Sequence, residues 1–313
     1  MRTPTPTVHI AEVFPALQGL RKETVRLHPR QGGDAGLTAS KMGGVFLWPK
    51  DEPWPRCTAV ESRDVDVEDP PGSGIVRVDI SPIEPDDPLH NDYLVGILQL
   101  RHEDVPGMDF YPGSDLCQLL WCPRYHPDDI TPFCRIYWRR AGAVTDPRVD
   151  APRPRRTDDD EELVGLVPRP CTLSPERVIE YPPLTELPET LQEHIAQWEA
   201  TADADGHLYE DDLSIATGTK GGGYARNPAP PPTCPACQRS MAYLLTVASA
   251  EWGSGGRERW CPEEERYLLS DDPSIDFRAR QAAVGPSVFL SRGFDLNVFI
   301  CRHHSEWPIA WSY

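Results

Sequence analysis

The chain has 313 residues, including 35 prolines and 23 glycines, and only 26% are charged, a composition typical of a loop-rich β protein rather than a helical bundle. Forty-nine acidic against 31 basic residues give a net charge of −18, so the surface repels phosphate backbones and nucleic-acid binding is disfavoured. The N-terminus lacks the apolar segment of a signal peptide, and no apolar run is long enough to span a membrane. We therefore expect a cytoplasmic protein whose nine cysteines are thiols or metal ligands.

The first half of the chain predicts one short helix followed by strands. Residues 10–20 could form a helix that Pro15 breaks or kinks, and the alternation over 24–29 predicts a strand. Four later apolar runs also predict strands: 75–80, 93–101, 116–122 and 133–140. The acidic stretch 61–73 is expected to be a solvated excursion.

Residues 148–162 are proline-rich and strongly charged, with no apolar face. This composition predicts a linker, because such a segment cannot bury enough apolar surface to fold by itself. The two parts on either side, 1–147 and 163–313, are both expected to be β-rich.

The second half begins with a predicted strand at 176–181. Apolar residues then recur at helical spacing after Pro188, which is placed to start a helix; they are Leu187, Leu191, Ile195 and Trp198. The stripe they form is expected to pack on a core. The apolar C-terminal residues 306–313 predict a last strand.

Four features recur in the same order in both halves. They are SKMGG (40–44) and TKGGG (219–223), the proline-flanked Cys57 and Cys234, residues 97–105 and 244–252, and the cysteine-ended strands 115–126 and 295–304. This order predicts an internal duplication. The predicted fold class is α+β, β-rich, with two pseudo-duplicated halves of mostly antiparallel sheet and few helices.

Two cysteine motifs in the second half predict a metal site. Cys234 and Cys237 form a Cys-x-x-Cys pair on a proline-flanked turn, and Cys301 and His304 form a Cys-x-x-His pair at the end of a strand. Three thiolates and one imidazole are the ligand set of a structural, tetrahedral Zn²⁺ site. His303 could take the place of His304, since the sequence does not distinguish adjacent histidines.

The other cysteines leave further possibilities open. Cys234 and Cys237 could form a redox dithiol, although the prolines before them cannot form the central strand that such a motif normally follows. A second zinc site in the first half would need Cys57, Cys122 and His126, completed by Cys117 or Cys134. Cys261 has no partner cysteine nearby in the sequence and is expected to be inert.

The order of these motifs resembles the YwqG-like proteins of bacteria. The resemblance covers residues 37–310 and rests on Ser-Lys-Met-Gly-Gly, Trp-Pro, Leu-Gln-Leu, Gly-Gly-Gly-Tyr, Cys-x-x-Cys, Met-x-x-Leu-Leu and Phe-Ile-Cys. It implies an α+β fold with internal duplication but no settled biochemical role, and some members look like neighbours of toxin–immunity systems. One departure is Leu245-Thr246-Val247, where many relatives keep a glutamine.

The second half is also similar to the zinc-binding programmed-cell-death family of eukaryotic ribosomal-protein chaperones. The shared features are a Gly-Gly segment, a Cys-x-x-Cys pair, an apolar strand pair and a late cysteine. For those relatives the implied activity is holding a client protein, without chemistry.

Several first-half residues are candidates for binding. Backbone amides at Gly43 and Gly44, with Lys41 nearby, could cradle a phosphate, but no P-loop or dinucleotide motif accompanies them, and tight turns or close backbone approach are the expected explanation. Trp54 lies in a proline-rich segment that could present aromatic rings to a peptide or close the end of a β layer. Gln99, in the Leu-Gln-Leu motif, completes the set.

No catalytic motif is found in the sequence. We therefore expect a protein-binding module, chaperone-like or an immunity or adaptor protein, with a structural zinc and a basic protein partner. The first alternative is a hydrolase or transferase with its site in the cleft between the halves. The second alternative is a thiol–disulfide redox protein that uses Cys234 and Cys237.

Overall fold

The computed structural model describes most of the chain, with gaps. The described residues are 1–33, 35–57, 61–64, 78–81, 92–123, 132–154, 165–226, 231–234, 236–252, 256–270, 285–286, 288, 293 and 295–312, with backbone only at 61–64, 78–81 and 305–312. Most of the predicted linker, 148–162, lies outside these residues, as does His126.

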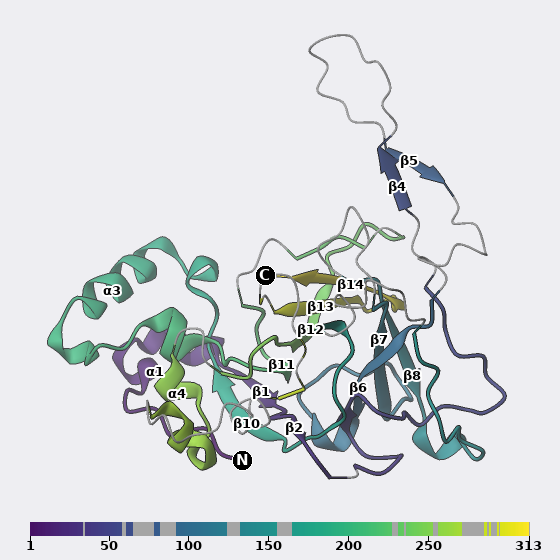
Figure 1. Ribbon diagram of the computed structural model, residues 1–313. Coiled ribbons are helices and arrows are strands. Elements are labelled where there is room, and N and C mark those ends of the chain that lie inside the picture. Colours follow the sequence, from purple (N-terminus) through teal and green to yellow (C-terminus); the bar gives the residue numbers. More distant parts are fainter. Residues whose placement is uncertain are drawn as a thin grey trace, which may run out of the picture.

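Two six-stranded antiparallel sheets form the body of the protein (Figure 1). Sheet A has the order β10 (Glu176–Glu180), β1 (Lys22–Arg26), β11 (Lys220–Gly222), β12 (Ala242–Val247), β13 (Leu296–Cys301), β14 (His304–Ser312). Sheet B has the order β2 (Arg30–Gln31), β9 (Cys171–Thr172), β3 (Lys41–Met42), β6 (Val95–Arg101), β7 (Leu116–Trp121), β8 (Cys134–Arg139). The β-rich α+β class predicted from composition is confirmed.

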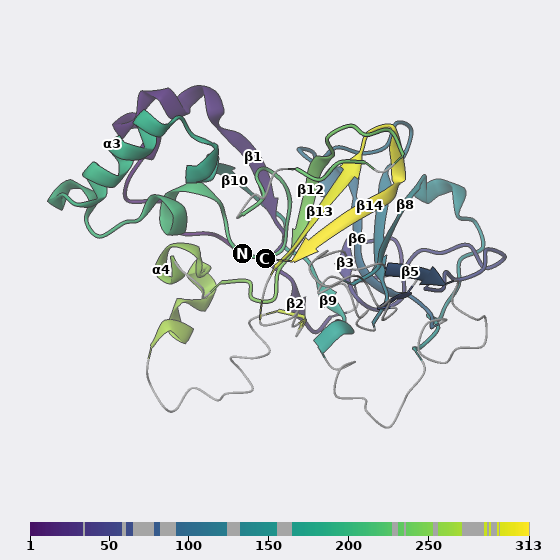
Figure 2. The same cartoon turned by 90° about the horizontal axis from the view of Figure 1, so that it is seen from above.

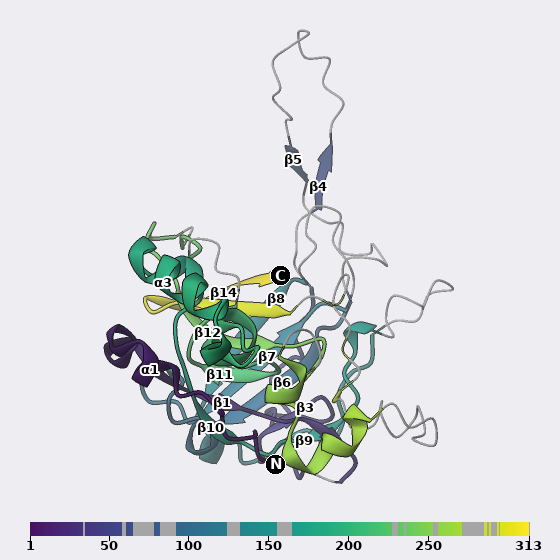
Figure 3. The ribbon, with the colours of Figure 1, turned by 90° about the vertical axis from the view of Figure 1, so that its left-hand side faces the viewer.

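A separate two-stranded ribbon carries β4 (Glu61–Asp64) and β5 (Val78–Ser81), which pair antiparallel. In Figures 1 and 3 this ribbon projects away from both sheets. The sequence predicted a strand at 75–80, close to β5, but it did not predict β4, because the acidic side chains around it gave no apolar pattern.

The helices are few and short. The described residues include the α-helices α1 (Ile10–Val13), α3 (Glu189–Glu199) and α4 (Arg257–Trp260) and the π-helix η6 (Tyr209–Ser214). The 3-10 helices are η1 (Pro15–Leu20), η2 (His102–Asp104), η3 (Ala141–Ala143), η4 (Leu184–Glu186), η5 (Ala202–Ala204) and η7 (Glu263–Leu269). Pro15 starts η1 directly after α1, so the predicted break at that residue is confirmed.

Helix α3 is the helix that the apolar spacing predicted. Pro188 occupies its N-cap position, and Leu191 and Ile195 are buried against Ile10 and Leu17 from the first helical segments. Figure 3 shows α1 and α3 on the same side of sheet A. The helical layer therefore forms a second, smaller core beside the sheets.

The two sheets have the same topology. In each sheet, the strand that lies next to the last four strands comes from the other half of the chain. The segment from β1 to β2 starts in sheet A and ends at the edge of sheet B, whereas the segment from β9 to β10 starts in sheet B and ends at the edge of sheet A. In each sheet the remaining four strands come from one half: β3, β6, β7 and β8, or β11 to β14. Each sheet therefore takes strands from both halves (Figure 2).

The strand registers of the two sheets also match. Lys41 faces Gln99 and Gln99 faces Gln118, as Lys220 faces Thr246 and Thr246 faces Asn297. Both sheets have a register shift one strand residue before this position, between Gly96 and Leu98 and between Tyr243 and Leu245. These matches pair the residues of the two halves without ambiguity.

Apolar side chains from both sheets share one core. It contains Val25, Leu98 and Leu119 together with Leu245 and Val298, so it joins residues from both halves. Among the described residues, no helix is long and apolar enough to cross a membrane.

Candidate metal centre

The first part of the site is a tight hairpin around Cys234 and Cys237. The amide of Cys234 donates to the Arg239 carbonyl at 2.8 Å, and the amide of Gln238 donates to the Cys234 carbonyl at 2.8 Å. Gln238 has a φ of +57°, the left-handed conformation that lets the chain turn back directly after Cys237. The hairpin thus holds both thiols on one side of a short turn.

The second part of the site is the turn between β13 and β14. Cys301 and His304 are paired residues at the ends of these strands, so only two residues separate them around the turn. A two-residue hairpin turn places the side chains of such a pair on the same face of the sheet. The Cys-x-x-His spacing therefore brings the thiol and the imidazole together.

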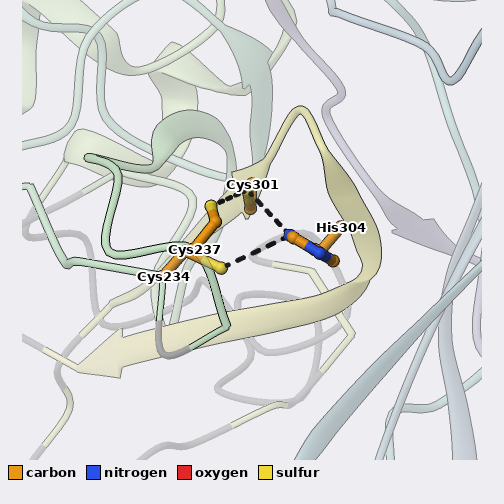
Figure 4. Close-up of side chains that lie close together, drawn as sticks. All are labelled: Cys234, Cys237, Cys301 and His304. Atoms are coloured by element: carbon orange, nitrogen blue, oxygen red, sulfur yellow. Dashed lines mark hydrogen bonds between the residues drawn. The ribbon is translucent and has the colours of Figure 1, made fainter.

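Figure 4 shows the four side chains converging from these two turns. Their ligand atoms all lie within 4.8 Å of one another. The Cys237 and Cys301 sulfurs are 3.5 Å apart, and Nδ1 of His304 lies 3.7 Å from the Cys301 sulfur and 3.8 Å from the Cys234 sulfur. Metal–sulfur bonds of about 2.3 Å and metal–nitrogen bonds of about 2.0 Å in a tetrahedron give edges of about 3.5–3.8 Å. The group has the dimensions of a four-coordinate metal site.

The local environment favours the thiolate form of Cys234. Burial by itself raises the pKa of a thiol, but the amides of Cys237 and Ala236 donate to the Cys234 sulfur, and the pKa is lowered to about 7. Cys234 and Cys301 are buried, while Cys237 and His304 are partly exposed. The pKa of the neighbouring Cys237 thiol is instead raised: the Arg239 amide acts to lower it, but burial and the Cys301 and Cys234 thiols outweigh that effect.

The structure distinguishes the two adjacent histidines. His304 lies in the cluster, whereas His303 is exposed and its Nε2 contacts the Arg239 guanidinium. The structure therefore places His304, and not His303, in the candidate metal site. Of the residues that the structure describes, these four are the only group of three or more metal-binding side chains.

The redox interpretation of Cys234 and Cys237 lacks its usual setting. A reactive dithiol lies at the N-terminus of a helix, but here the pair lies in a hairpin whose flanking residues Thr233 and Ser240 form a β-bridge. No disulfide joins the two cysteines.

The first half has the same backbone hydrogen bonds around Cys57 as the second half has around Cys234, but it does not have the same set of candidate ligands. The Cys57 amide donates to the Asp92 carbonyl at 2.8 Å, as Cys234 does to Arg239, and Leu94 donates to Pro55 as Met241 does to Pro232. Cys57 and Cys122 share one apolar cluster, as do their counterparts Cys234 and Cys301. However, residues 58–91, which include β4 and β5, lie between Cys57 and Asp92 in the sequence, whereas only residues 235–238 lie between Cys234 and Arg239.

The predicted second metal site receives no support from the described residues. Cys117 and Cys134, which were to complete it, belong to the main core instead of the cluster of Cys57 and Cys122. Burial raises the pKa values of the Cys117 and Cys134 thiols far above the ordinary range. Cys261 is buried in a further cluster, apart from the four ligands.

Lys41, Gly43 and Gly44 form a tight turn beside a cavity of about 480 Å³. Both glycines have positive φ, and a Cβ atom on Gly43 would lie 2.9 Å from the Pro168 carbonyl oxygen. The Lys41 ammonium donates to the carbonyls of Gly36 and Val45. These contacts account for the motif as a turn, and a binding role for it stays a prediction.

Trp54 and Gln99 also make internal contacts. The Trp54 indole donates to the Leu94 carbonyl at 2.7 Å and its ring lies 4.8 Å from that of Trp48. The Gln99 carbonyl oxygen accepts from Leu47 at 2.8 Å, and its amide nitrogen donates to two backbone carbonyls. Their roles as binding residues remain predictions.

Sequence reasoning missed a group of buried charges near the start of sheet A. Arg26, Lys220, Glu180 and Glu251 are all almost fully buried. One signal could have found Glu251, because the paired stretches 97–105 and 244–252 both place an acidic residue at the same position, Asp104 in the first and Glu251 in the second.

Comparisons with known proteins give no identity: no family model and no curated protein matches this chain.

Proposed function

We propose that this chain is a protein-binding module whose fold is fastened by a structural Zn²⁺ and which takes a basic protein partner. The observation that carries the metal part is the closed set of Cys234, Cys237, Cys301 and His304. Four protein ligands leave no open position for substrate, and thiolate with imidazole is the donor set of structural zinc. The ion would join the Cys-x-x-Cys hairpin to the turn between β13 and β14.

The distribution of charge supports a basic partner. Residues 58–91 carry nine acidic and two basic residues, and the β4–β5 pair within them forms the ribbon that projects from the sheets. A projecting strand pair offers backbone edges, and its carboxylates attract cationic surfaces. The ribbon follows Cys57 in the sequence, as the proposed metal-binding hairpin follows its counterpart Cys234. We therefore assign contact with the client protein to the first half and metal-dependent stability to the second half.

The resemblance to YwqG-like proteins and to zinc-binding chaperones agrees with this assignment and is part of the proposal. A cytoplasmic location is proposed with it, because thiolate ligands persist in a reducing compartment.

A ribbon deletion tests the function. In the variant, the tetrapeptide Pro-Ala-Ser-Gln replaces residues 58–91; it is the sequence of residues 235–238 with Cys237 changed to Ser. The tagged variant and the tagged wild-type chain are then compared in affinity capture from the source cells at about 0.15 M salt. We expect one stoichiometric basic partner with the wild type and none with the variant, at equal zinc content and equal circular dichroism. Equal recovery of that partner with both chains would contradict the proposal, as would a wild-type chain that captures no partner.

A further inference from the structure

The strand pairing between the halves reveals an arginine site that is filled in one half only. Arg26 is 1% exposed and its guanidinium is enclosed by backbone carbonyls. Nε donates to Thr217 at 3.0 Å, and Nη2 donates to Glu251 at 3.2 Å and to Trp260 at 3.1 Å. Nη1 donates to the Thr3 hydroxyl.

Two hydrogen bonds of the Thr219 hydroxyl hold Glu251 beside this site. The Thr219 hydroxyl donates to the Glu251 carboxylate at 2.7 Å and accepts from the Ala248 amide at 3.2 Å. The buried Glu251 charge then lies close enough to Arg26 to favour the charged guanidinium, although burial lowers the pKa of Arg26 to about 10.

The first half contains the same pattern. The Ser40 hydroxyl donates to the Asp104 carboxylate at 2.5 Å and accepts from the Arg101 amide at 2.8 Å. Ser40 precedes Lys41 as Thr219 precedes Lys220, and Asp104 follows Gln99 by five residues as Glu251 follows Thr246, so Asp104 is the counterpart of Glu251. Thr38 is in turn the counterpart of Thr217, whose carbonyl accepts from Arg26.

The arginine itself is missing from the first half. Arg26 faces Lys220 across β1 and β11, and the residue that faces Lys41 across β9 and β3 is Thr172. Thr172 is too short to reach the position of a guanidinium. Instead, Thr38, Ser40 and Asp104 line a cavity of about 640 Å³, with Glu103, Arg101 and Leu173.

The charges around this cavity favour a cation. The Arg101 guanidinium faces Glu103 at 3.7 Å and Asp115 at 3.6 Å, so it is balanced by carboxylates other than Asp104. Ser40 donates to one oxygen of Asp104. The carboxylates of Glu103 and Asp104 outnumber the one cation among the lining residues.

We propose that this cavity binds a guanidinium group, supplied by an arginine side chain of the partner protein, in the way that the second half binds Arg26. The identification of the source as a protein rests on the proposed function, whereas the guanidinium chemistry rests on the internal comparison. Planar guanidinium donates along several directions at once, which suits a pocket of carbonyls and one carboxylate better than lysine does.

Titration of the full-length, metal-loaded chain with N-acetyl-L-arginine N-methylamide tests the proposal. We expect saturable binding at millimolar concentration, followed by calorimetry, with the corresponding lysine derivative at least about tenfold weaker. Asp104→Asn should weaken arginine binding about tenfold or more, and Glu189→Gln, an exposed carboxylate on α3, should leave it unchanged. Free L-arginine should bind more weakly than the blocked derivative.

Thr172→Arg is the complementary variant, because it restores an arginine at the position that Arg26 occupies in the second half. We expect it to fill the cavity from within and abolish binding of the probe. No binding by the wild type, or equal binding by Asp104→Asn, would overturn the proposal even if Thr172→Arg fails to fold. Tighter binding of free L-arginine would overturn the assignment to a protein side chain. None of these results depends on the ribbon deletion, so failure here and failure of the proposed function are distinguishable.

Discussion

At the scale of single residues, His28 links stability to pH. It is 1% exposed, and its Nε2 lies 2.9 Å from the Glu176 carboxylate. Burial lowers the pKa of His28 to about 4, with the nearby Arg26 and Arg30 acting in the same direction, and this outweighs the hydrogen bond to Glu176. His28 is therefore neutral at pH 7, and its Nε2–H donates to Glu176.

The sign of the pH effect follows from these values. The unfolded chain binds a proton on His28 near pH 6.5 and the folded chain only near pH 4, so the free energy of unfolding falls as the pH falls through this window. The loss is at most about 3 kcal/mol. Urea unfolding at pH 7.0 and 4.5 measures it, and His28→Asn, which tolerates the positive φ of this residue, should flatten the dependence. An equal slope in the variant would contradict the assignment to His28.

At the scale of elements, the two Lys-x-Gly-Gly turns, residues 41–44 and 220–223, differ in the atoms that surround their last glycine. Gly223 and its counterpart Gly44 have similar positive φ, +81° and +73°. A Cβ atom on Gly223 would lie 2.1 Å from the Glu180 carboxylate, whereas on Gly44 the nearest atom is 3.5 Å away, in Pro170. Glu180 is held there by the buried Lys220 ammonium and cannot move away at low cost.

The two glycines therefore respond differently to the same substitution. Gly44→Ala should cost about 1 kcal/mol of unfolding free energy, the penalty of a left-handed backbone alone. Gly223→Ala should cost at least about 2 kcal/mol more, because the methyl group collides with a fixed carboxylate. Chemical denaturation of both variants measures the difference. Equal losses of unfolding free energy would show that the Glu180 carboxylate moves aside, and would contradict the prediction.

The strands that apolar runs or alternation define were predictable, and the shortest strands were not. The predicted strands at 93–101, 116–122 and 133–140 correspond to β6, β7 and β8, since a buried strand must be apolar along its length. Strand β9 has only two residues and β3 has a lysine, so neither gives a periodic signal. Their place is fixed by pairing across the sheet.

The four residues of the candidate metal site were also predictable, because ligand spacing in each of the two motifs is local in sequence. The guanidinium pocket was not, since Arg26, Thr217 and Glu251 become neighbours only through the crossing of β1 into sheet A. The correspondence of this site with Ser40 and Asp104 depends on the strand registers of the two sheets, which form only in the folded chain.

At the scale of the whole molecule, exchange of β1 and β9 ties the halves into one core. Each sheet needs a strand from the other half, and the main core contains apolar side chains of both. The candidate metal site of Cys234, Cys237, Cys301 and His304 includes both ends of the turn between β13 and β14, so an ion bound there would fix this hairpin of sheet A. Loss of the ion should therefore weaken the whole chain rather than one half of it.

The most direct measurement is the metal content of the purified chain, determined together with its thermal unfolding. The account predicts one zinc per chain, loss of that zinc and a lower Tm in Cys237→Ser, and full zinc content in Cys171→Ser, a buried cysteine outside the site. A wild-type chain without stoichiometric zinc, or a Cys237→Ser variant that keeps both its zinc and its Tm, would contradict the account.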